Sequence, residues 1–304
     1  MSKKGILCIT VLLVVFTVSL TGLAFARNSE SPPLKILLVG YGWYAGIPEG
    51  QINNAETIAR SLNNKMILAR DAKGRVVAQG KITSLIVPVT WEGAFPPVIE
   101  AIQSLKPDIV VGLGTFPGAP GISPEPVASN FEQGCDANPS DPTDVDCRNQ
   151  PIVNGGAPYR YGTLPYNEMV IAMNKGGIPS YKGQALPYVQ PGNPAGWCDY
   201  PQCPYPPGGS MGNPGDPQPS ATPGWYLCNF MLYNLSMYQP ISGVDFDFGF
   251  IHVPTRHEYA TKNPSDPDFM TKITEWVMPS MEMSRMIKGI EVSLEECVRA
   301  RAGE

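Results

Sequence analysis

Apolar residues occur along this chain in short continuous runs that alternate with amphipathic stretches. The runs at 35–40, 108–114 and 244–253 are typical of strands that are buried on both faces of a sheet. Further elements are predicted between and after these runs: helices over 52–63, 96–105, 166–176 and 225–238, a β-rich stretch over 75–89, and a C-terminal amphipathic helix reaching Cys297. This alternation predicts an α/β fold, a three-layer sandwich with a mostly parallel central sheet.

Two stretches interrupt the regular pattern. Residues 184–223 contain eleven prolines and keep neither a helical nor a strand period, and residues 131–150 form a shorter polar loop. Both carry a pair of cysteines. We therefore expect a single α/β domain over 27–304 with a Pro/Gly-rich, disulfide-stapled loop insertion at about 184–223.

Composition narrows the classes of protein that this chain could represent. Of its 304 residues 43% are apolar, so the chain can bury a real core and is not a disordered tail. Lys and Arg number 22 against 27 Asp and Glu, which leaves no basic surface for a phosphate backbone, and no nucleic-acid partner is expected. The only histidines are His252 and His257, which argues against a multi-histidine metal site. Neither a metal nor another cofactor is expected.

The N-terminus has the layout of a signal peptide. Lys3 and Lys4 precede an apolar run to about Leu23, and the small-x-small sequence at 24–26 follows it. Residues 1–26 are therefore predicted to be a signal peptide and the protein to be exported, to a periplasm or out of the cell. The alternative is an uncleaved membrane anchor, because the run is close to the length that spans a bilayer.

Export changes the interpretation of the cysteines. Local spacing favours Cys135 with Cys147 and Cys198 with Cys203, since a staple in a Pro/Gly/Asp-rich loop replaces a missing core. Zinc binding by these loop cysteines is the alternative, although paired C-x-x-C spacing and a nearby histidine are lacking. Two more cysteines lie in helical apolar patterns and are the candidates for free thiols: Cys228 and Cys297.

Cys228 has two interpretations. Its spacing from three apolar residues, Met231, Leu232 and Leu235, fits a small core-facing side chain. However, the Pro-Gly at 223–224 breaks the chain just upstream, which places Cys228 in the first turn of its helix, where unpaired N–H groups and the helix dipole stabilise a thiolate. The second interpretation makes Cys228 a nucleophile.

His252 lies at the end of the predicted strand 244–253. In open α/β sheets the functional crevice lies outside the carboxyl ends of the strands, so His252 is a candidate general base. The alternative is a structural histidine that donates to a nearby carbonyl. His257 falls in a polar turn and is expected to be solvated. A Cys–His pair also needs a third group to orient the imidazole, and position alone does not select one carboxylate.

Several segments resemble the pyroglutamyl peptidase I (pyrrolidone-carboxylate peptidase) family of cysteine peptidases, in matching order. PIVNGGAPYRYGTLP at 151–165 is similar to the family's PIVEGGPAAYFSTLP, and PGWYLCN at 223–229 and GFIHVP at 249–254 are similar to the segments that hold the family's nucleophile and histidine. GISPEPVASN at 121–130 and the final helix add support. The resemblance runs discontinuously from about 35 to 297.

The resemblance implies roles for individual residues. Cys228 becomes the nucleophile, His252 the general base and Glu125 the carboxylate that orients the imidazole, in hydrolysis of the amide bond after an N-terminal pyroglutamyl residue. The implied substrate is a peptide with a blocked N-terminus, and an aromatic turn after the first strand helps to hold the lactam ring. The residues expected to bind substrate are Tyr41, Tyr44 and Tyr226. Family members often assemble, so a homo-oligomer is possible.

Some positions depart from the family pattern. Pro126 follows Glu125 where the family tends to have arginine, so a basic residue is missing or supplied elsewhere, with Arg148 as a candidate. The 184–223 insertion could be a lid, a selectivity filter, an oligomer contact or a block. Two alternatives to a pyroglutamyl peptidase therefore stay open: an exported, non-catalytic binding protein on the same fold, and a peptidase or amidase with altered specificity for the N-terminal cap.

Overall fold

In the computed structural model of the protein, the chain divides into two units, Met1–Pro32 and Pro33–Glu304, and the second is described here. The structure describes residues 32–43, 52–116, 119, 121–136, 146–183, 219–220, 226–256 and 280–303. The predicted signal peptide 1–26, Tyr44, the Cys198–Cys203 pair and nearly all of the 184–223 insertion lie outside these residues. Within them, no helix combines the length and the apolar character needed to cross a membrane.

The centre of the second unit is a six-stranded sheet in the order β2-β3-β1-β4-β12-β5. The four inner strands run parallel: β3 (Val76–Val87), β1 (Leu34–Tyr41), β4 (Ile109–Thr115) and β12 (Asp247–Val253). The two edge strands are antiparallel to their neighbours: β2 (Met66–Arg70) and β5 (Ser123–Glu125). The predicted mostly parallel sheet is thus confirmed.

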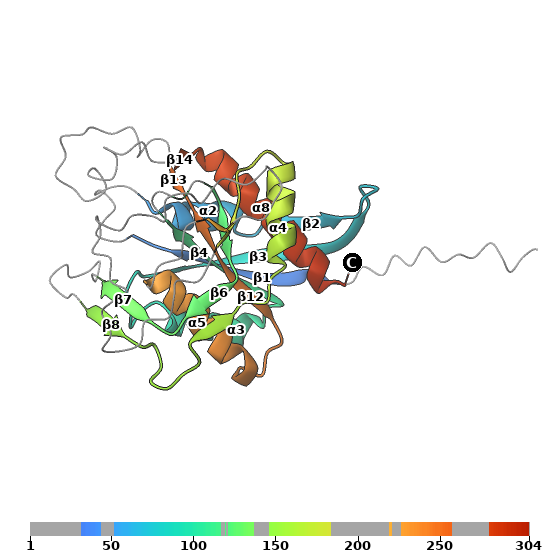
Figure 1. The fold of residues 1–304 in the computed structure, drawn as a ribbon. Helices are drawn as coiled ribbons and strands as arrows, with labels where there is room; N and C mark the ends of the chain where they lie inside the picture. Colours follow the sequence, from blue (N-terminus) through green and yellow to red (C-terminus); the bar gives the residue numbers. More distant parts are fainter. Residues whose placement is uncertain are drawn as a thin grey trace, which may run out of the picture. The chain divides into compact units, whose positions relative to one another are not determined.

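Helices cover both faces of this sheet (Figure 1). One face carries α2 (Asn54–Leu62), α4 (Tyr166–Lys175) and α8 (Met283–Arg301), and the other carries α3 (Pro96–Leu105) and α5 (Leu227–Tyr238). Each face has its own core of buried apolar side chains, one built around Ile36 and Ile290 and the other around Phe250 and Leu235. Burial of these two cores is the main stabilising term, because apolar area removed from water contributes roughly 25 cal/mol per Å².

Short elements complete the described unit. Two antiparallel pairs lie outside the main sheet: β6 (Val127–Ser129) with β9 (Tyr159–Tyr161), and β7 (Glu132–Cys135) with β8 (Cys147–Gln150). Two-residue parallel pairs are formed by β10 (Lys182–Gly183) with β11 (Pro219–Ser220) and by β13 (Thr255–Arg256) with β14 (Ser280–Met281). A 3₁₀ turn, η1 (Gln239–Ile241), follows α5.

The structure adds strands that the pattern of apolar residues did not predict. Strand β2 is an edge strand with two exposed ends, and β5 has the sequence Ser-Pro-Glu, which carries no apolar alternation. Its three residues are nevertheless buried. β12 pairs with them on one side, and Ile122, just before β5, donates to the Pro179 carbonyl oxygen and accepts from Tyr181 N. Tertiary pairing, rather than local propensity, therefore makes β5 a strand.

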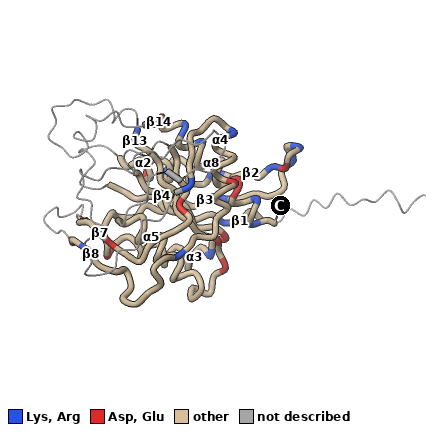
Figure 2. Tube along the Cα trace, in the orientation of Figure 1, with Lys and Arg blue, Asp and Glu red and all other residues tan. Residues whose placement is uncertain are grey.

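Charged residues are distributed over the described elements. Figure 2 shows lysine and arginine positions interspersed with aspartate and glutamate positions along the tube. Most of the ion pairs have an exposed partner, as in Arg60–Glu56 and Arg75–Asp71, and exposed pairs contribute about 0–1 kcal/mol each. The buried pair Glu125–His252 is of a different kind and belongs to the candidate site.

Candidate active site

His252 lies at the carboxyl end of β12, as the sequence predicts. In the sheet it stands opposite Gly114 of β4 on one side and Ser123 of β5 on the other. Its side chain is 2% exposed and lies between two aromatic rings, with ring centroids 5.1 Å from Phe250 and 5.5 Å from Phe116. The imidazole is thus fixed in orientation by strand pairing and by ring packing.

Glu125 reaches the imidazole from the neighbouring edge strand. It pairs with Phe250, two residues before His252, so the carboxylate lies diagonally across the antiparallel pair from the imidazole. Glu125 Oε1 is hydrogen-bonded to His252 Nδ1, and both side chains are buried. The other ring nitrogen, Nε2, is left for a further partner, which is the arrangement that orients a catalytic imidazole.

Burial and charge act together on this pair. Burial raises the pKa of Glu125 above its usual value, and the charge of His252 opposes that rise. For His252, burial lowers the pKa, but the charge of Glu125, the charge of Cys228 and hydrogen bonds to both outweigh it and raise the pKa to about 10. The histidine therefore favours the imidazolium form when a carboxylate and a thiolate flank it.

Cys228 is the second residue of α5, where the sequence analysis places it. The residue before the helix, Tyr226, has extended backbone, and no side chain in the described part of the chain caps the helix start. Cys228 is half-buried, is not in a disulfide, and lies close enough to His252 for its charge to raise the pKa of the imidazole. Free N–H groups at a helix start favour a negative charge on an adjacent sulfur atom or oxygen atom.

Gly114 makes room for the sulfur atom. A Cβ atom at this position would lie 2.6 Å from Cys228 Sγ, closer than real Cβ contacts allow, and 3.0 Å from the ring of Phe250, which is also a tight contact. Because Gly114 is also the register partner of His252, the thiol rests over the strand beside the imidazole. The glycine at the end of the predicted strand 108–114 is thus a site residue that the sequence analysis noted only as a strand end.

Residues on both sides of Cys228 hold the start of α5 in place. Tyr41 Oη donates to the carbonyl oxygen of Leu227 at 2.6 Å. The Asn229 side chain binds the loop that follows Glu125: its Oδ1 accepts from Ser129 N at 2.8 Å, and its Nδ2 donates to the carbonyl oxygens of Ser129 and Phe131. The sequence analysis missed Asn229, although this residue is in the quoted segment PGWYLCN.

The predicted substrate-binding tyrosines have different positions. Tyr41 is 3% exposed at the end of β1, and burial, followed by the nearby charge of Cys228, raises its pKa, so its hydroxyl stays a donor. Tyr226 is half-buried, and its hydroxyl donates to the carbonyl oxygen of Cys135 at 2.9 Å. Tyr44 lies outside the described residues.

Arg148 does not stand beside Glu125 as a replacement for the family arginine. Its guanidinium is bonded to three carboxylates, those of Glu92, Glu132 and Asp146, and lies 5.5 Å from the centre of the Trp91 ring. These contacts hold the Arg148 guanidinium at the β7–β8 hairpin and the neighbouring loop that carries Trp91.

The loop cysteines Cys135 and Cys147 form a disulfide, as the spacing predicts. Zinc binding by this pair is therefore excluded, because both sulfur atoms are bonded to each other. In the described part of the chain, no group of three or more His, Cys, Asp or Glu side chains is arranged to hold a metal ion.

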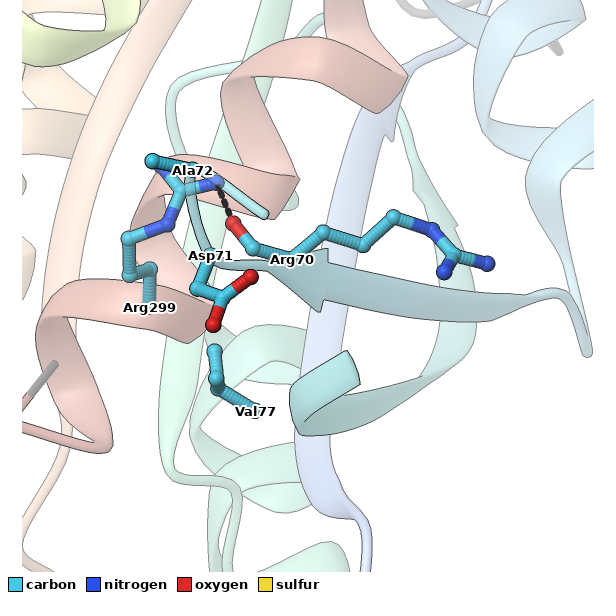
Figure 3. Close-up of a pocket in the computed structure, with 5 residues that line it drawn as sticks. All are labelled: Arg70, Asp71, Ala72, Val77 and Arg299. Carbon is cyan, nitrogen blue, oxygen red and sulfur yellow. Dashed lines mark hydrogen bonds between the residues drawn. The ribbon is translucent and has the colours of Figure 1, made fainter. Parts of the chain in front are cut away.

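A shallow pocket lies elsewhere, at the turn between β2 and β3. Its lining comprises Arg70, Asp71, Ala72, Val77 and Arg299 (Figure 3). Arg299 donates to the carbonyl oxygen of Arg70 at 2.8 Å and is also paired with Glu296, so its charge is already satisfied. None of the predicted site residues lines this pocket.

Comparisons with known proteins identify the family of this chain. The family model described as pyroglutamyl peptidase matches residues 34–186 and 210–300, with its interruption inside the predicted insertion. The pyrrolidone-carboxylate peptidase of Bacillus cereus strain B4264 is 26% identical over 262 residues, covering 86% of this chain and 91% of the relative. That of Pyrococcus furiosus is 24% identical over 263 residues, covering 86% of this chain and 99% of the relative.

Solved structures agree on the fold. Pyrrolidone carboxyl peptidase from Pyrococcus furiosus superposes with a TM-score of 0.60 at 22% identity, covering 88% of this chain and 100% of the other. Pyroglutamyl peptidase I from Bacillus amyloliquefaciens gives a TM-score of 0.59 at 20% identity, covering 88% and 96%. The family match spans most of the chain and includes Glu125, Cys228 and His252, so this protein belongs to the pyroglutamyl peptidase family of cysteine-type omega peptidases.

Proposed function

We propose that the protein removes an N-terminal pyroglutamyl residue from peptides, with Cys228 as nucleophile, His252 as general base and acid, and Glu125 as the carboxylate that orients the imidazole. One observation carries the proposal: the Cys228 sulfur atom lies over Gly114, the strand partner of His252, while Glu125 holds the opposite side of the same imidazole. The names of the relatives support the choice of substrate.

The chemistry follows from these positions. The thiolate of Cys228 attacks the carbonyl carbon that joins the pyroglutamyl residue to the peptide, and a C–S bond forms. The C–N bond then breaks as the protonated His252 gives its proton to the leaving amine. Water attacks the resulting thioester while His252 takes a proton from it, and the C–S bond breaks to release pyroglutamate and restore the thiol.

The oxygen atom of the tetrahedral intermediate needs donors. Backbone N–H groups in the first turn of α5, the turn that contains Cys228, are proposed to bind this oxygen. The aromatic side chains of Tyr41 and Tyr226, together with Tyr44, are proposed as the wall that holds the flat lactam ring. Of the two described tyrosines, Tyr226 is the more exposed and so the one more open to substrate.

An activity assay tests this proposal. The full chain, with the Cys228 thiol kept unoxidised and the Cys135–Cys147 disulfide intact, is assayed on a pyroglutamyl amide of a fluorescent amine beside the variants Cys228→Ala and His252→Ala. Matching amides of proline and alanine test the alternative of a different N-terminal cap, which the proline after Glu125 motivates. Activity that persists in Cys228→Ala contradicts the mechanism, and turnover of proline or alanine amides alone contradicts the substrate.

We also propose that the protein is exported and that residues 1–26 are its signal peptide, from the charged, apolar and small-residue order of that segment. Fractionation of producing cells, with the N-terminus of the purified protein determined by mass, tests this. A start near residue 27 outside the cytoplasm supports export and cleavage, whereas an intact Met1 in the cytoplasm contradicts both. Sedimentation of the purified protein tests whether it forms the homo-oligomer that the family resemblance implies.

A further inference from the structure

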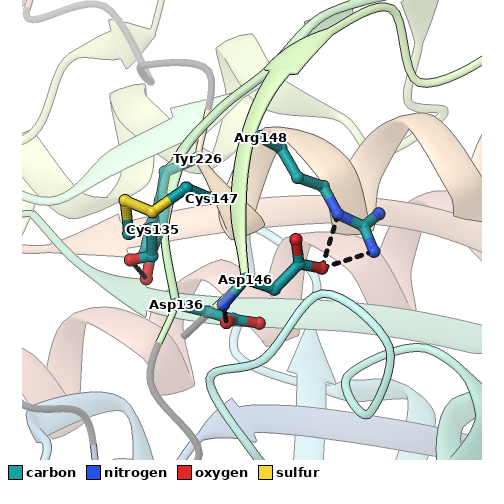
Figure 4. The surroundings of a disulfide bond; sticks show 6 residues. All are labelled: Cys135, Asp136, Asp146, Cys147, Arg148 and Tyr226. Atoms are coloured by element: carbon teal, nitrogen blue, oxygen red, sulfur yellow. Dashed lines mark hydrogen bonds and ion pairs between the residues drawn. A yellow bond between two sulfur atoms is a disulfide. The ribbon is translucent and has the colours of Figure 1, made fainter. Parts of the chain in front are cut away.

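The disulfide hairpin β7–β8 contacts the start of the helix that carries Cys228. Tyr226, two residues before Cys228, donates its hydroxyl hydrogen to the carbonyl oxygen of Cys135, which is itself bonded to Cys147. Figure 4 places the tyrosine beside the disulfide. The hydroxyl therefore links the backbone of the stapled hairpin to the residue that precedes α5.

The tyrosine ring is held by the same hairpin. Gly134 has φ of +113°, and a Cβ atom there would lie 2.9 Å from the ring of Tyr226, so the ring packs directly on the hairpin backbone. On the other side, Trp91 meets Tyr226 edge to face, with ring centroids 5.3 Å apart. Ring and hydroxyl together leave Tyr226 little freedom to move relative to the hairpin.

The hairpin is in turn fixed to the loop that carries Trp91. Asp136, next to the disulfide, accepts a hydrogen bond from Trp91 N through Oδ2 and one from Asp146 N through Oδ1 at 3.0 Å. Arg148 lies over the Trp91 ring and binds Glu92 in the same loop. The hairpin is thus braced at several points and does not depend on Tyr226 for its own position.

We propose that Tyr226 is a positioning residue through which the stapled hairpin holds the Cys228 thiol beside His252. The inference rests on the proposed role of Cys228 as nucleophile. A sulfur atom at a helix start is placed by the backbone just before it, and a misplacement of about 1 Å at a reacting atom can cost on the order of 100-fold in rate. The disulfide matters here because it keeps the Cys135 carbonyl oxygen where the Tyr226 hydroxyl can reach it.

The test compares three proteins with wild type: Tyr226→Phe, which keeps the ring and removes the hydroxyl; the double variant Cys135→Ser/Cys147→Ser; and the triple combination. The main readout is the rate at which iodoacetamide alkylates Cys228, located by peptide mass, because this rate needs no peptide substrate. The values of kcat and KM on the pyroglutamyl amide and the thermal unfolding temperature are measured beside it. Tyr238→Phe is the matched control, since Tyr238 ends the same helix and its hydroxyl binds Gln103.

We expect Tyr226→Phe to slow alkylation and to lower kcat about 5-fold, the effect of one lost hydrogen bond, with KM unchanged. The double variant is expected to slow alkylation and to lower kcat at least as much as Tyr226→Phe does. The triple variant is expected to lose no more than the double variant in either measurement. Tyr238→Phe changes neither. If the double variant does not fold, Gly134→Ala takes its place, because its added carbon displaces the Tyr226 ring.

Two results overturn the proposal. One is a triple variant whose loss is the product of the two separate losses, which means that the hairpin and Tyr226 act independently. The other is a Tyr226→Phe protein that raises KM with alkylation and kcat unchanged, which means that the hydroxyl contacts substrate. A wild-type protein that turns over no pyroglutamyl amide contradicts the proposed function alone, because the alkylation rates still report on how Cys228 is positioned.

Discussion

Cys228 and Cys297 both lie in helices whose apolar residues recur every three or four positions, and neither is in a disulfide. Cys297 is near the end of α8, 2% exposed, with its sulfur atom 3.9 Å from that of Met169. Burial raises its pKa strongly, and the charges of Asp247 and Glu296 add to the rise. Cys228 instead starts its helix, half-buried, beside a histidine.

The periodic pattern of apolar residues therefore does not decide what a thiol can do. Cys297 is a small apolar side chain in a core, kept protonated by its surroundings. Cys228 has a helix start that no side chain in the described part of the chain caps, a paired imidazole beside it and a glycine beneath its sulfur atom. The position at the helix start and the strand beneath the sulfur atom distinguish Cys228 from Cys297, and four experiments test this difference.

Replacing each thiol in turn is expected to give the largest change, a loss of activity for Cys228 and not for Cys297. Cys228→Ala is expected to lower kcat/KM on the pyroglutamyl amide by at least about 1,000-fold, because no other group forms the thioester. Cys297→Ala keeps the wild-type kcat and lowers the unfolding free energy by about 1 kcal/mol, the ordinary cost of a small core change. A Cys297→Ala protein that stays folded but loses turnover would mean that Cys297 is needed for catalysis, which contradicts the comparison.

The second experiment measures the thiols directly. Iodoacetamide is expected to label Cys228 in the folded wild-type protein within minutes and to label Cys297 only after denaturant is added, because Cys297 is buried. His252→Ala is expected to slow labelling of Cys228 by on the order of 10-fold at pH 7, since the imidazolium no longer favours the thiolate. Peptide mass identifies each labelled site, and equal labelling of the two thiols in the folded protein contradicts the comparison.

The third experiment concerns the glycine under the sulfur atom. Gly114→Ala places a carbon atom in the space of Cys228 Sγ and is expected to lower kcat by on the order of 100-fold through misplacement of the thiol. Gly80→Ala is the matched control: its Cβ atom would lie 2.7 Å from Ile36 and from Val298, in the core that contains Cys297.

Both glycine variants are expected to lose about 1–3 kcal/mol of unfolding free energy from overpacking. Only Gly114→Ala should lose turnover per folded molecule, measured by activity after titration of the folded fraction. Equal loss of turnover in both variants means that overpacking of the sheet, rather than the position of the sulfur atom, controls the rate.

The smallest expected effect is on stability as a function of pH. Burial lowers the pKa of His252, but Glu125 and Cys228 raise it to about 10 in the folded protein, well above its ordinary value. The charged pair therefore contributes its full stability below about pH 6.5, the unfolded pKa, and loses it as the pH rises through about 10.

Removing the partner carboxylate isolates this contribution. Glu125→Gln is expected to unfold at a lower temperature than wild type at pH 6, by a few degrees, and the gap should narrow as the pH rises through about 10. Calorimetry of both proteins between pH 6 and 10.5 measures the gap. A gap that stays constant over this range contradicts the paired imidazolium.

Much of the fold could be predicted from the sequence. The buried parallel strands and the helices between them follow from apolar runs and 3/4 spacing, and the helix predicted at 96–105 has the observed bounds. Strand β5 could not be predicted in this way, because Ser-Pro-Glu has no strand pattern of its own and becomes extended through pairing with β12. That short strand carries Glu125, so the carboxylate was reached only through the family resemblance.

Some of the residues that support the site could also be predicted from the sequence, and others could not. The free Cys228 and the disulfide between Cys135 and Cys147 were predicted from local context and spacing. Asn229 and the hydroxyl of Tyr226 were not predicted as supports, because each bonds to a residue at least 90 positions away in the chain. Arg148, which the sequence suggests as a replacement for the missing basic residue, instead forms ion pairs with Glu92, Glu132 and Asp146.

The amino-acid sequence predicts the order of the elements, the α/β class, the family and the reactive residue types: a cysteine at a helix start, a histidine at a strand end and a glutamate within a family segment. Whether these three groups meet depends on the tertiary fold. Residues 125, 228 and 252 come from an edge strand, a helix and an inner strand, and local propensity specifies none of those contacts. Strand register and the packing of α5 over Gly114 set the distances between them, and these depend on side chains from the whole sheet rather than on any one segment.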